Sequence, residues 1–149
     1  LDNQGKIKGK IIFVSSGCVF LKNHYYVLRE RLQLTEAEAE KLCSHIDFNL
    51  KQEVIQWIRL AAKARAVTIG IDNIKTTPKK VKFFLVASGN SNYSNYRFIN
   101  DANSSRLLSS IELSAVLGKG NVNFAAITDE RFAERLTDAI ARYEWFVKH

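Results

Sequence analysis

Apolar residues recur at helical spacing in two stretches of this chain, 50–62 and 132–147, and each pattern predicts a helix with one buried face. Two further predicted helices begin with a capping box, Thr35-x-x-Glu38 and Ser109-x-x-Glu112. In a capping box a hydroxyl and a carboxylate satisfy free N–H groups at the start of a helix. The predicted helices cover residues 35–46, 49–62, 109–117 and 128–147, and Asn49 is expected to cap the second of them.

Short apolar and β-branched runs separate the later stretches and predict strands. Two shorter helices are expected at residues 72–77 and 96–102, and Pro78 ends the first because proline lacks the N–H that a helix needs. From residue 49 onward a strand and a helix alternate four times, which is typical of helices packed on both faces of one sheet. We therefore expect an α/β fold, a three-layer α/β/α sandwich with a mixed four-stranded sheet. The predicted strands cover residues 67–69, 81–87, 106–108 and 122–127.

The first 48 residues are expected to form a separate, small N-terminal α/β segment. A strand at 11–14 and helices at 23–32 and 35–46 are too little to bury much surface alone. We place a domain boundary near Phe48, so that residues 1–48 precede a domain over 49–149. The chain begins at Leu1 and contains no methionine, which fits a fragment of a longer protein or a chain that lost residues in processing.

The positive charge of the chain is concentrated in one segment. The 149 residues carry a formal net charge of +7, and eight basic residues against two acidic ones lie between 51 and 82. Such a basic segment favours a polyanionic partner, although a charged run is often only a solvated face.

A glycine turn stands in the middle of this basic segment. Val67-Thr68-Ile69 predicts a strand that ends at Gly70, and Asp72 and Asn73 offer caps to the short helix that follows. A helix N-terminus has free N–H groups and attracts phosphate, and we expect lysines beside it to add to that attraction. The basic residues expected around the turn are Lys63, Arg65, Lys75, Lys79, Lys80 and Lys82, and all of them except Lys82 are expected RNA-binding residues.

Candidate catalytic and metal-binding chemistry is sparse. Cys18 with His24 and Cys43 with His45 have spacings that fit no standard zinc pattern, and no phosphate-binding Walker loop or dinucleotide motif occurs. We therefore expect no metal, no cofactor, no small-molecule substrate and no enzymatic activity. Two cysteines without C-x-x-C spacing suit a reducing cytoplasm, and no apolar run approaches the roughly 20 residues of a membrane span.

Five short motifs follow one another between about residues 50 and 147. They are Leu60-Ala61-x-Lys63-Ala64, Gly70 before Asp72-Asn73, Val86-Ala87-Ser88, Glu112-Leu113-x-x-x-Leu117-Gly118-Lys119, and Ala126-Ile127-Thr128-Asp129-x-x-Phe132-Ala133. Their order and spacing resemble the kink-turn-binding ribosomal protein family, the L-seven-Ae and L-thirty-e group, and especially its bacterial YlxQ-like members. The resemblance implies a bacterial, ribosomal protein-like RNA-binding protein that acts in transcription termination, translation or ribosome assembly.

In that family the glycine turn and the following helix grip a sharply bent RNA, and a second loop adds contacts. The usual polar pair is Asn-Glu, whereas Asp72-Asn73 stands here and Thr76 occupies the place of the usual lysine. The resemblance implies structured RNA as the partner, from the ribosome or the transcription machinery. It implies RNA contacts by Gly70, Asp72, Asn73, Lys75, Lys119, Gly120 and Asn121.

The segment Asp2-x-x-Gly5-Lys6-x-x-Gly9-Lys10 resembles, over a shorter length, part of a YlxR-type nucleic-acid-binding domain. Two other functions stay open from the sequence. The chain also fits the RNA-recognition domain of an RNA methyltransferase, or a protein-interaction module that has lost RNA binding. Tyr93 and Tyr96 beside Arg97 fit either packing within a helix or stacking on unpaired bases.

Overall fold

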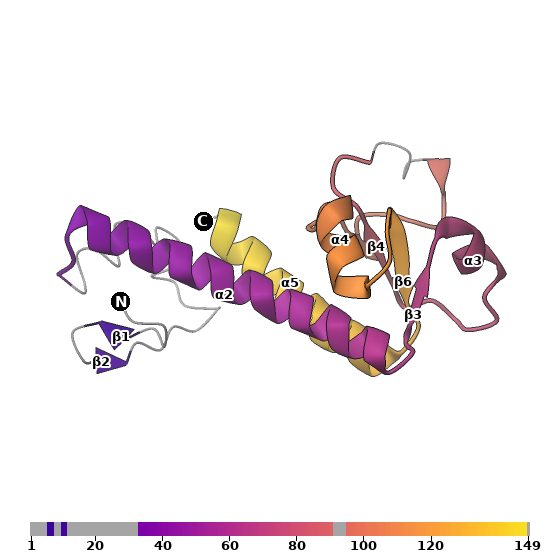
Figure 1. The fold of residues 1–149 in the computed structure, drawn as a ribbon, viewed down its shortest axis with the longest axis horizontal. Helices are drawn as coiled ribbons and strands as arrows, with labels where there is room; N and C mark the ends of the chain where they lie inside the picture. The colour runs from indigo at the N-terminus through magenta and orange to yellow at the C-terminus, as the bar shows by residue number, and fades with distance from the viewer. Residues whose placement is uncertain (1–5, 8–9, 12–32, 91–94, 149) are drawn as a thin grey trace. The chain divides into compact units, whose positions relative to one another are not determined.

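The computed structural model describes residues 6–7, 10–11, 33–90 and 95–148 (Figure 1). The predicted strand at 11–14 and helix at 23–32 lie almost entirely outside these residues. The chain divides into two compact units, one of Leu1–Glu53 with Ala141–His149 and one of Val54–Ile140. The candidate site lies in the second unit.

The first unit contains a short antiparallel strand pair and parts of two helices. Strand β1 (Lys6–Ile7) pairs with β2 (Lys10–Ile11). The core of this unit joins α2 (Glu36–Lys63) to the end of α5 (Glu130–Lys148), and an ion pair between Arg142 and Glu53 connects the same helices. The core residues are Leu34, Ala39, Leu42 and Phe146, with Cys43, Ile46, Leu50 and Trp145 packed against them.

Helix α2 is continuous, so the prediction of two helices that part near Phe48 is wrong. The Thr35 capping box is confirmed, because Glu38 N donates to Thr35 Oγ1 at 3.2 Å and Thr35 N donates to Glu38 Oε1 at 3.3 Å. Asn49 is an exposed residue inside the helix rather than a cap. Asparagine costs an exposed helix position less than about 1 kcal/mol, and the apolar stripe continues past it. The predicted domain boundary at residue 48 therefore falls inside a helix.

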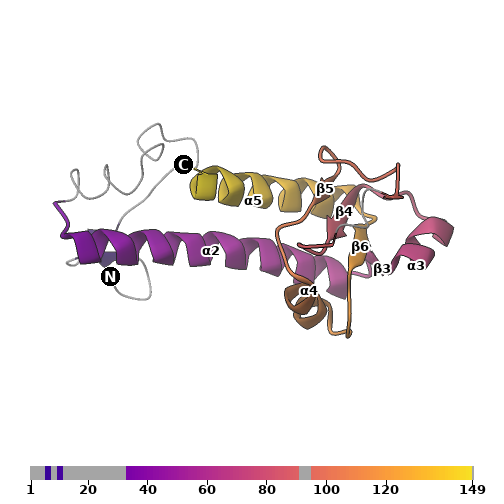
Figure 2. The ribbon, with the colours of Figure 1, turned by 90° about the horizontal axis from the view of Figure 1, so that it is seen from above.

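The second unit is built on a mixed sheet of four strands. Their order is β3 (Val67–Ile69), β6 (Phe124–Ile127), β4 (Phe83–Val86) and β5 (Ser104–Ser105), as Figure 2 shows. Strands β3 and β4 both run antiparallel to β6, and β5 runs parallel to β4. The α/β class and the mixed four-stranded sheet are confirmed, and the three-layer stacking stays a prediction.

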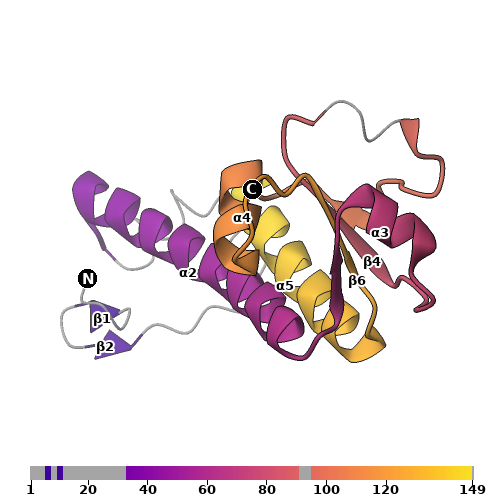
Figure 3. The same cartoon turned by 45° about the vertical axis from the view of Figure 1, so that its right-hand side comes forward.

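Helices α3 (Ile71–Thr76) and α4 (Ser110–Leu117) lie on opposite sides of strands β4 and β6 (Figure 3). On the α3 side, Ile74 packs in a buried cluster with Phe84 and Phe124. On the other side, Leu85 borders a cavity of about 10 Å³ that residues of α2, α4 and α5 also line. Strands β4 and β6 are buried along their whole length, which fits sheet faces covered on both sides.

The helix predicted at residues 96–102 is wrong. Asn100 Oδ1 accepts from the N–H groups of Ala102 and Asn103, at 2.9 and 3.0 Å. Asparagine side chains that bond to nearby backbone in this way favour turns over helix. The strand expected at 106–108 likewise lies earlier, at β5.

Helices α4 and α5 begin where the sequence predicts. Ser109 caps α4 with the complete capping box, and Gly118 ends it in the left-handed conformation. Asp129 Oδ1 accepts from Arg131 N at 2.9 Å at the start of α5. Among the described residues, no helix is both long enough and apolar enough to cross a membrane.

Candidate nucleic-acid interface

The strand directions bring three connecting segments together at one edge of the sheet. Strands β3 and β4 each pair antiparallel with β6, so β3 and β4 end at the edge where β6 begins. Gly70 N donates to Phe124 O at 2.9 Å, and Ala87 N donates to Asn123 O at 2.9 Å. Gly70, the turn at residues 88–90 and the segment 119–123 therefore share what we call the cleft edge.

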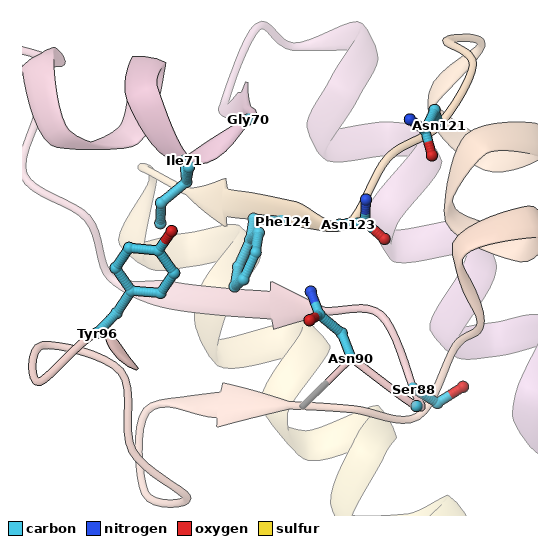
Figure 4. Close-up of a pocket in the computed structure, with 9 residues that line it drawn as sticks. Gly70, Ile71, Ser88, Asn90, Tyr96, Asn121, Asn123 and Phe124 are labelled. Atoms are coloured by element: carbon cyan, nitrogen blue, oxygen red, sulfur yellow. The ribbon is translucent and has the colours of Figure 1, made fainter. Parts of the chain in front are cut away.

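A cleft of about 530 Å³ opens between these three segments (Figure 4). The ring of Phe124 lies between Tyr96 on one side and Asn90 with Asn123 on the other. None of the described residues that line the cleft is charged. They are Gly70, Ile71, Ser88, Gly89, Asn90, Tyr96, Asn121, Asn123 and Phe124.

Aromatic contacts fix the inner wall of the cleft and tie it to Lys75. The rings of Tyr96 and Phe124 meet edge to face, with centroids 5.4 Å apart. Lys75 Nζ lies 4.9 Å from the centroid of the Tyr96 ring, within the range of a cation–π contact. The cleft therefore combines carboxamides and aromatic rings with a cation at its border, groups that recognise base edges, base faces and phosphates respectively.

The Gly70 turn is held by its backbone rather than by a side-chain cap. Gly70 is the N-cap of α3 with φ 90° and ψ 141°, and no side chain caps the helix. The predicted capping roles of Asp72 and Asn73 are therefore wrong; Asn73 Nδ2 instead donates to Ile69 O at 2.8 Å. Helix α3 has six residues, so few peptide dipoles align, and we assign no phosphate site to its N-terminus.

Hydroxyl groups of α4 position the second predicted loop. Ser110 Oγ donates to Val122 O at 2.9 Å, and Val122 N donates to Ser114 Oγ at 3.0 Å. These bonds hold the chain beside Asn121, which adopts φ 58° and lines the cleft. Lys119, Gly120 and Asn121 are exposed at the cleft edge, as are Asp72, Asn73 and Lys75 on α3.

The other basic residues predicted around Gly70 lie at the opposite edge. Lys79 Nζ donates to Arg65 O at 3.4 Å, before β3 begins, and Thr128 N donates to Ala66 O at 2.9 Å, after β6 ends. Lys82 N donates to Ile127 O at 2.8 Å at that same end of β6. We call Lys63, Arg65, Lys79 and Lys80 the basic edge. The expectation that Lys79, Lys80 and Lys82 flank the Gly70 turn is wrong, because residues 77–82 run back along the sheet.

Acidic residues of α5 lie beside Lys82, next to the basic edge. Lys82 lines a hollow of about 440 Å³ with Glu130, Glu134 and Asp138 of α5. Asp129 pairs with Arg131 at 3.2 Å, and the hydrogen bond from this guanidinium lowers the pKa of the Asp129 carboxyl. We therefore leave Lys82 outside the basic edge, since three carboxylates share its surroundings.

Arg65 ends α2 in a conformation that usually belongs to glycine. Ala66 N donates to Ala61 O at 2.9 Å and Arg65 N donates to Ala62 O at 3.1 Å, the two bonds of a Schellman motif. In this motif Arg65 takes φ 57°, where a side chain costs about 1 kcal/mol relative to glycine.

Replacing Arg65 by glycine should therefore stabilise the protein. We expect Arg65→Gly to raise the free energy of unfolding by about 1 kcal/mol, measured by urea denaturation followed by circular dichroism. Arg65→Lys, which keeps the positive charge and a long side chain at this φ, is the matched control and should leave stability unchanged. A destabilised glycine variant would contradict a strained backbone at Arg65.

Sequence reasoning missed part of the cleft. Ser88, Asn90 and Asn123 line the cleft, although none of them is among the predicted site residues. For Ser88 and Asn90 the signal is a Ser-Gly-Asn turn directly after a buried strand, the position where open α/β sheets place functional loops. Asn123 lies directly before strand β6, and the sequence carries no such signal for it. Tyr93 lies outside the described residues.

Comparisons of the chain with protein-family models, with curated proteins and with solved structures found no match. The residues of the cleft edge and their geometry are therefore the basis on which a function can be assigned.

Proposed function

We propose that this protein binds structured RNA at the cleft edge, without catalysing a reaction. The observation that carries the proposal is the cleft itself, where the Gly70 turn and Asn121, both expected at an RNA site, converge with Tyr96 and Phe124. Asparagine carboxamides offer both donors and acceptors to base edges, and aromatic rings suit unpaired bases. A sharply bent RNA that exposes bases beside a duplex would present both features.

The charges around the cleft support the same ligand. Lys75 lies on the Tyr96 ring, and Lys119 stands exposed in the loop that carries Asn121. Lysine contacts to phosphates supply affinity that falls with salt, while contacts to bases supply selectivity. We place the RNA in the bacterial cytoplasm, where it would belong to the ribosome or the transcription machinery.

The direct test is binding of the full chain to two labelled RNAs over a series of salt concentrations. One RNA contains a kink-turn and the other is a straight duplex of equal length. We expect tighter binding to the kink-turn RNA that persists as salt rises. Equal and steeply salt-dependent binding would contradict a site in the cleft, and no binding to either RNA would favour the protein-interaction module.

Lys75→Gln is the variant that best probes the border of the cleft. We expect about a three- to tenfold loss of kink-turn RNA affinity, with a salt slope shallower by about 1, because one cation is removed. Lys82→Gln is the matched control, because Lys82 lies at the opposite edge beside carboxylates. Fluorescence anisotropy measures both affinities. Equal losses in the two variants would place the contact outside the cleft edge.

A further inference from the structure

The basic edge is a second concentration of positive charge, separate from the cleft. Lys63, Arg65, Lys79 and Lys80 come from the end of α2 and from the segment between α3 and β4, and all four are exposed. Within the part of the chain that the structure describes, none of them forms an ion pair with a carboxylate. Clustered like charges repel one another, so an arrangement of this kind favours an anionic partner.

The two edges lie at opposite ends of the strands. Gly70 follows the end of β3, whereas Arg65 precedes its start, and the same separation holds along β6 and β4. Strands of three or four residues span about 10–13 Å at the usual rise per residue. A phosphate held at the basic edge therefore stands apart from an RNA seated in the cleft.

A hydrogen bond joins the two segments that supply the basic edge. The Lys79 ammonium donates to the carbonyl of Arg65, so the segment after α3 is tied to the end of α2. Arg65 itself holds a backbone conformation that glycine adopts more easily. A charged residue in a backbone conformation that costs free energy is a reason to infer a role for its side chain.

We propose that the basic edge is a second RNA-binding surface, which holds the phosphate backbone of a duplex while the cleft holds a bent RNA. The inference takes RNA as the class of ligand from the proposed function. The choice of the basic edge as the binding surface does not depend on that function. Lysine and arginine side chains bind phosphate oxygens whatever the base, so we expect duplex binding at the basic edge to depend little on sequence. The protein thereby bridges two RNA segments.

The carboxylates of α5 set the direction from which the duplex approaches. Glu130, Glu134 and Asp138 share the hollow beside Lys82 and repel phosphates on that side. The duplex therefore lies over Lys63, Arg65, Lys79 and Lys80, away from the exposed surface of α5.

The test compares two variants of the full chain on two RNAs. The basic-edge variant changes Lys63, Arg65, Lys79 and Lys80 to glutamine, and the cleft variant changes Lys75 and Lys119 to glutamine. Kink-turn RNA is immobilised, loaded with protein and then offered a labelled straight duplex. Circular dichroism melting of each variant shows whether it is folded. Arg65→Gly is a second basic-edge variant with a single substitution, which removes one charge and also removes the backbone strain at this position.

We expect the wild-type complex to capture the duplex. The basic-edge variant should keep its kink-turn affinity within threefold, lose at least tenfold in duplex affinity, and show a salt slope shallower by about 3–4. The cleft variant should lose affinity for kink-turn RNA. When the duplex is offered alone, this variant should keep its duplex affinity. Unchanged duplex binding by the folded basic-edge variant would overturn the inference. A wild-type protein that is bound to kink-turn RNA but captures no duplex would also overturn it, as would a parallel loss of affinity for both RNAs in the basic-edge variant. Duplex binding at the basic edge without kink-turn binding would refute the proposed function and leave this surface standing.

Discussion

Phe124→Ala should lower the free energy of unfolding by about 3–5 kcal/mol, the usual cost of removing a buried aromatic ring. Phe124 is only 8% exposed and packs with Phe84, Ile74 and Ala126 between the sheet and α3. Its ring also meets Tyr96, so the substitution removes the centre of the cleft as well as part of the core. Urea denaturation followed by circular dichroism measures the loss.

Phe98→Ala is the matched control for this substitution. Phe98 touches the same aromatic cluster, with its centroid 5.6 Å from that of Phe84, but 41% of it is exposed. We expect a loss of about 1 kcal/mol, because less apolar surface is removed from water there. Equal losses at the two positions would mean that Phe124 does not occupy the core.

Gly70→Ala should cost about 1–3 kcal/mol and weaken RNA binding at the same time. A φ of 90° with ψ 141° is a conformation that residues with a side chain rarely adopt. The added Cβ would meet only Asn73 Nδ2, at 3.8 Å, which is an ordinary contact. The cost is therefore conformational, and relieving it by a change in φ would move Ile71 and the border of the cleft.

Gly120→Ala separates this effect from the general loss of a glycine. Gly120 lies at the same edge, has no positive φ, and a Cβ there would meet nothing within 4 Å. We expect its stability to stay within about 0.5 kcal/mol of the wild type. Chemical denaturation and anisotropy with kink-turn RNA measure both variants. A Gly70→Ala protein as stable as Gly120→Ala would show that the turn is not constrained.

Local signals in the sequence predicted the fold where they did not compete with packing. The capping boxes at Thr35 and Ser109 and the apolar spacing of α5 correctly located helix starts. The helix start predicted at Asn49 is wrong because the capping preference of one asparagine stabilises less than the burial of a continuous apolar face of the helix. The turn at 100–103 was missed because its stability comes from asparagine side chains that bond to backbone, which periodicity does not reveal.

The candidate site was predictable only in part, because it depends on strand direction. Gly70 and Asn121 were expected together, and they do line one cleft. Counting charges along the chain placed Lys79 and Lys80 with Gly70, but the segment after α3 returns to the start of β3. A one-dimensional charge count cannot tell the two ends of a strand apart. That distinction needs the antiparallel pairing of β3 and β4 with β6.

The central place of β6 in the sheet has a consequence for folding during synthesis. Within the described sheet β3 pairs only with β6, and β4 also pairs antiparallel with it, yet β6 follows both in the chain. Translation adds about 5–20 residues per second, so the earlier strands wait for seconds without this partner. We expect a nascent chain to form the cleft edge and the basic edge in one late step, when β6 inserts between β3 and β4. The chain can therefore bind RNA only after almost all of the second unit has left the ribosome.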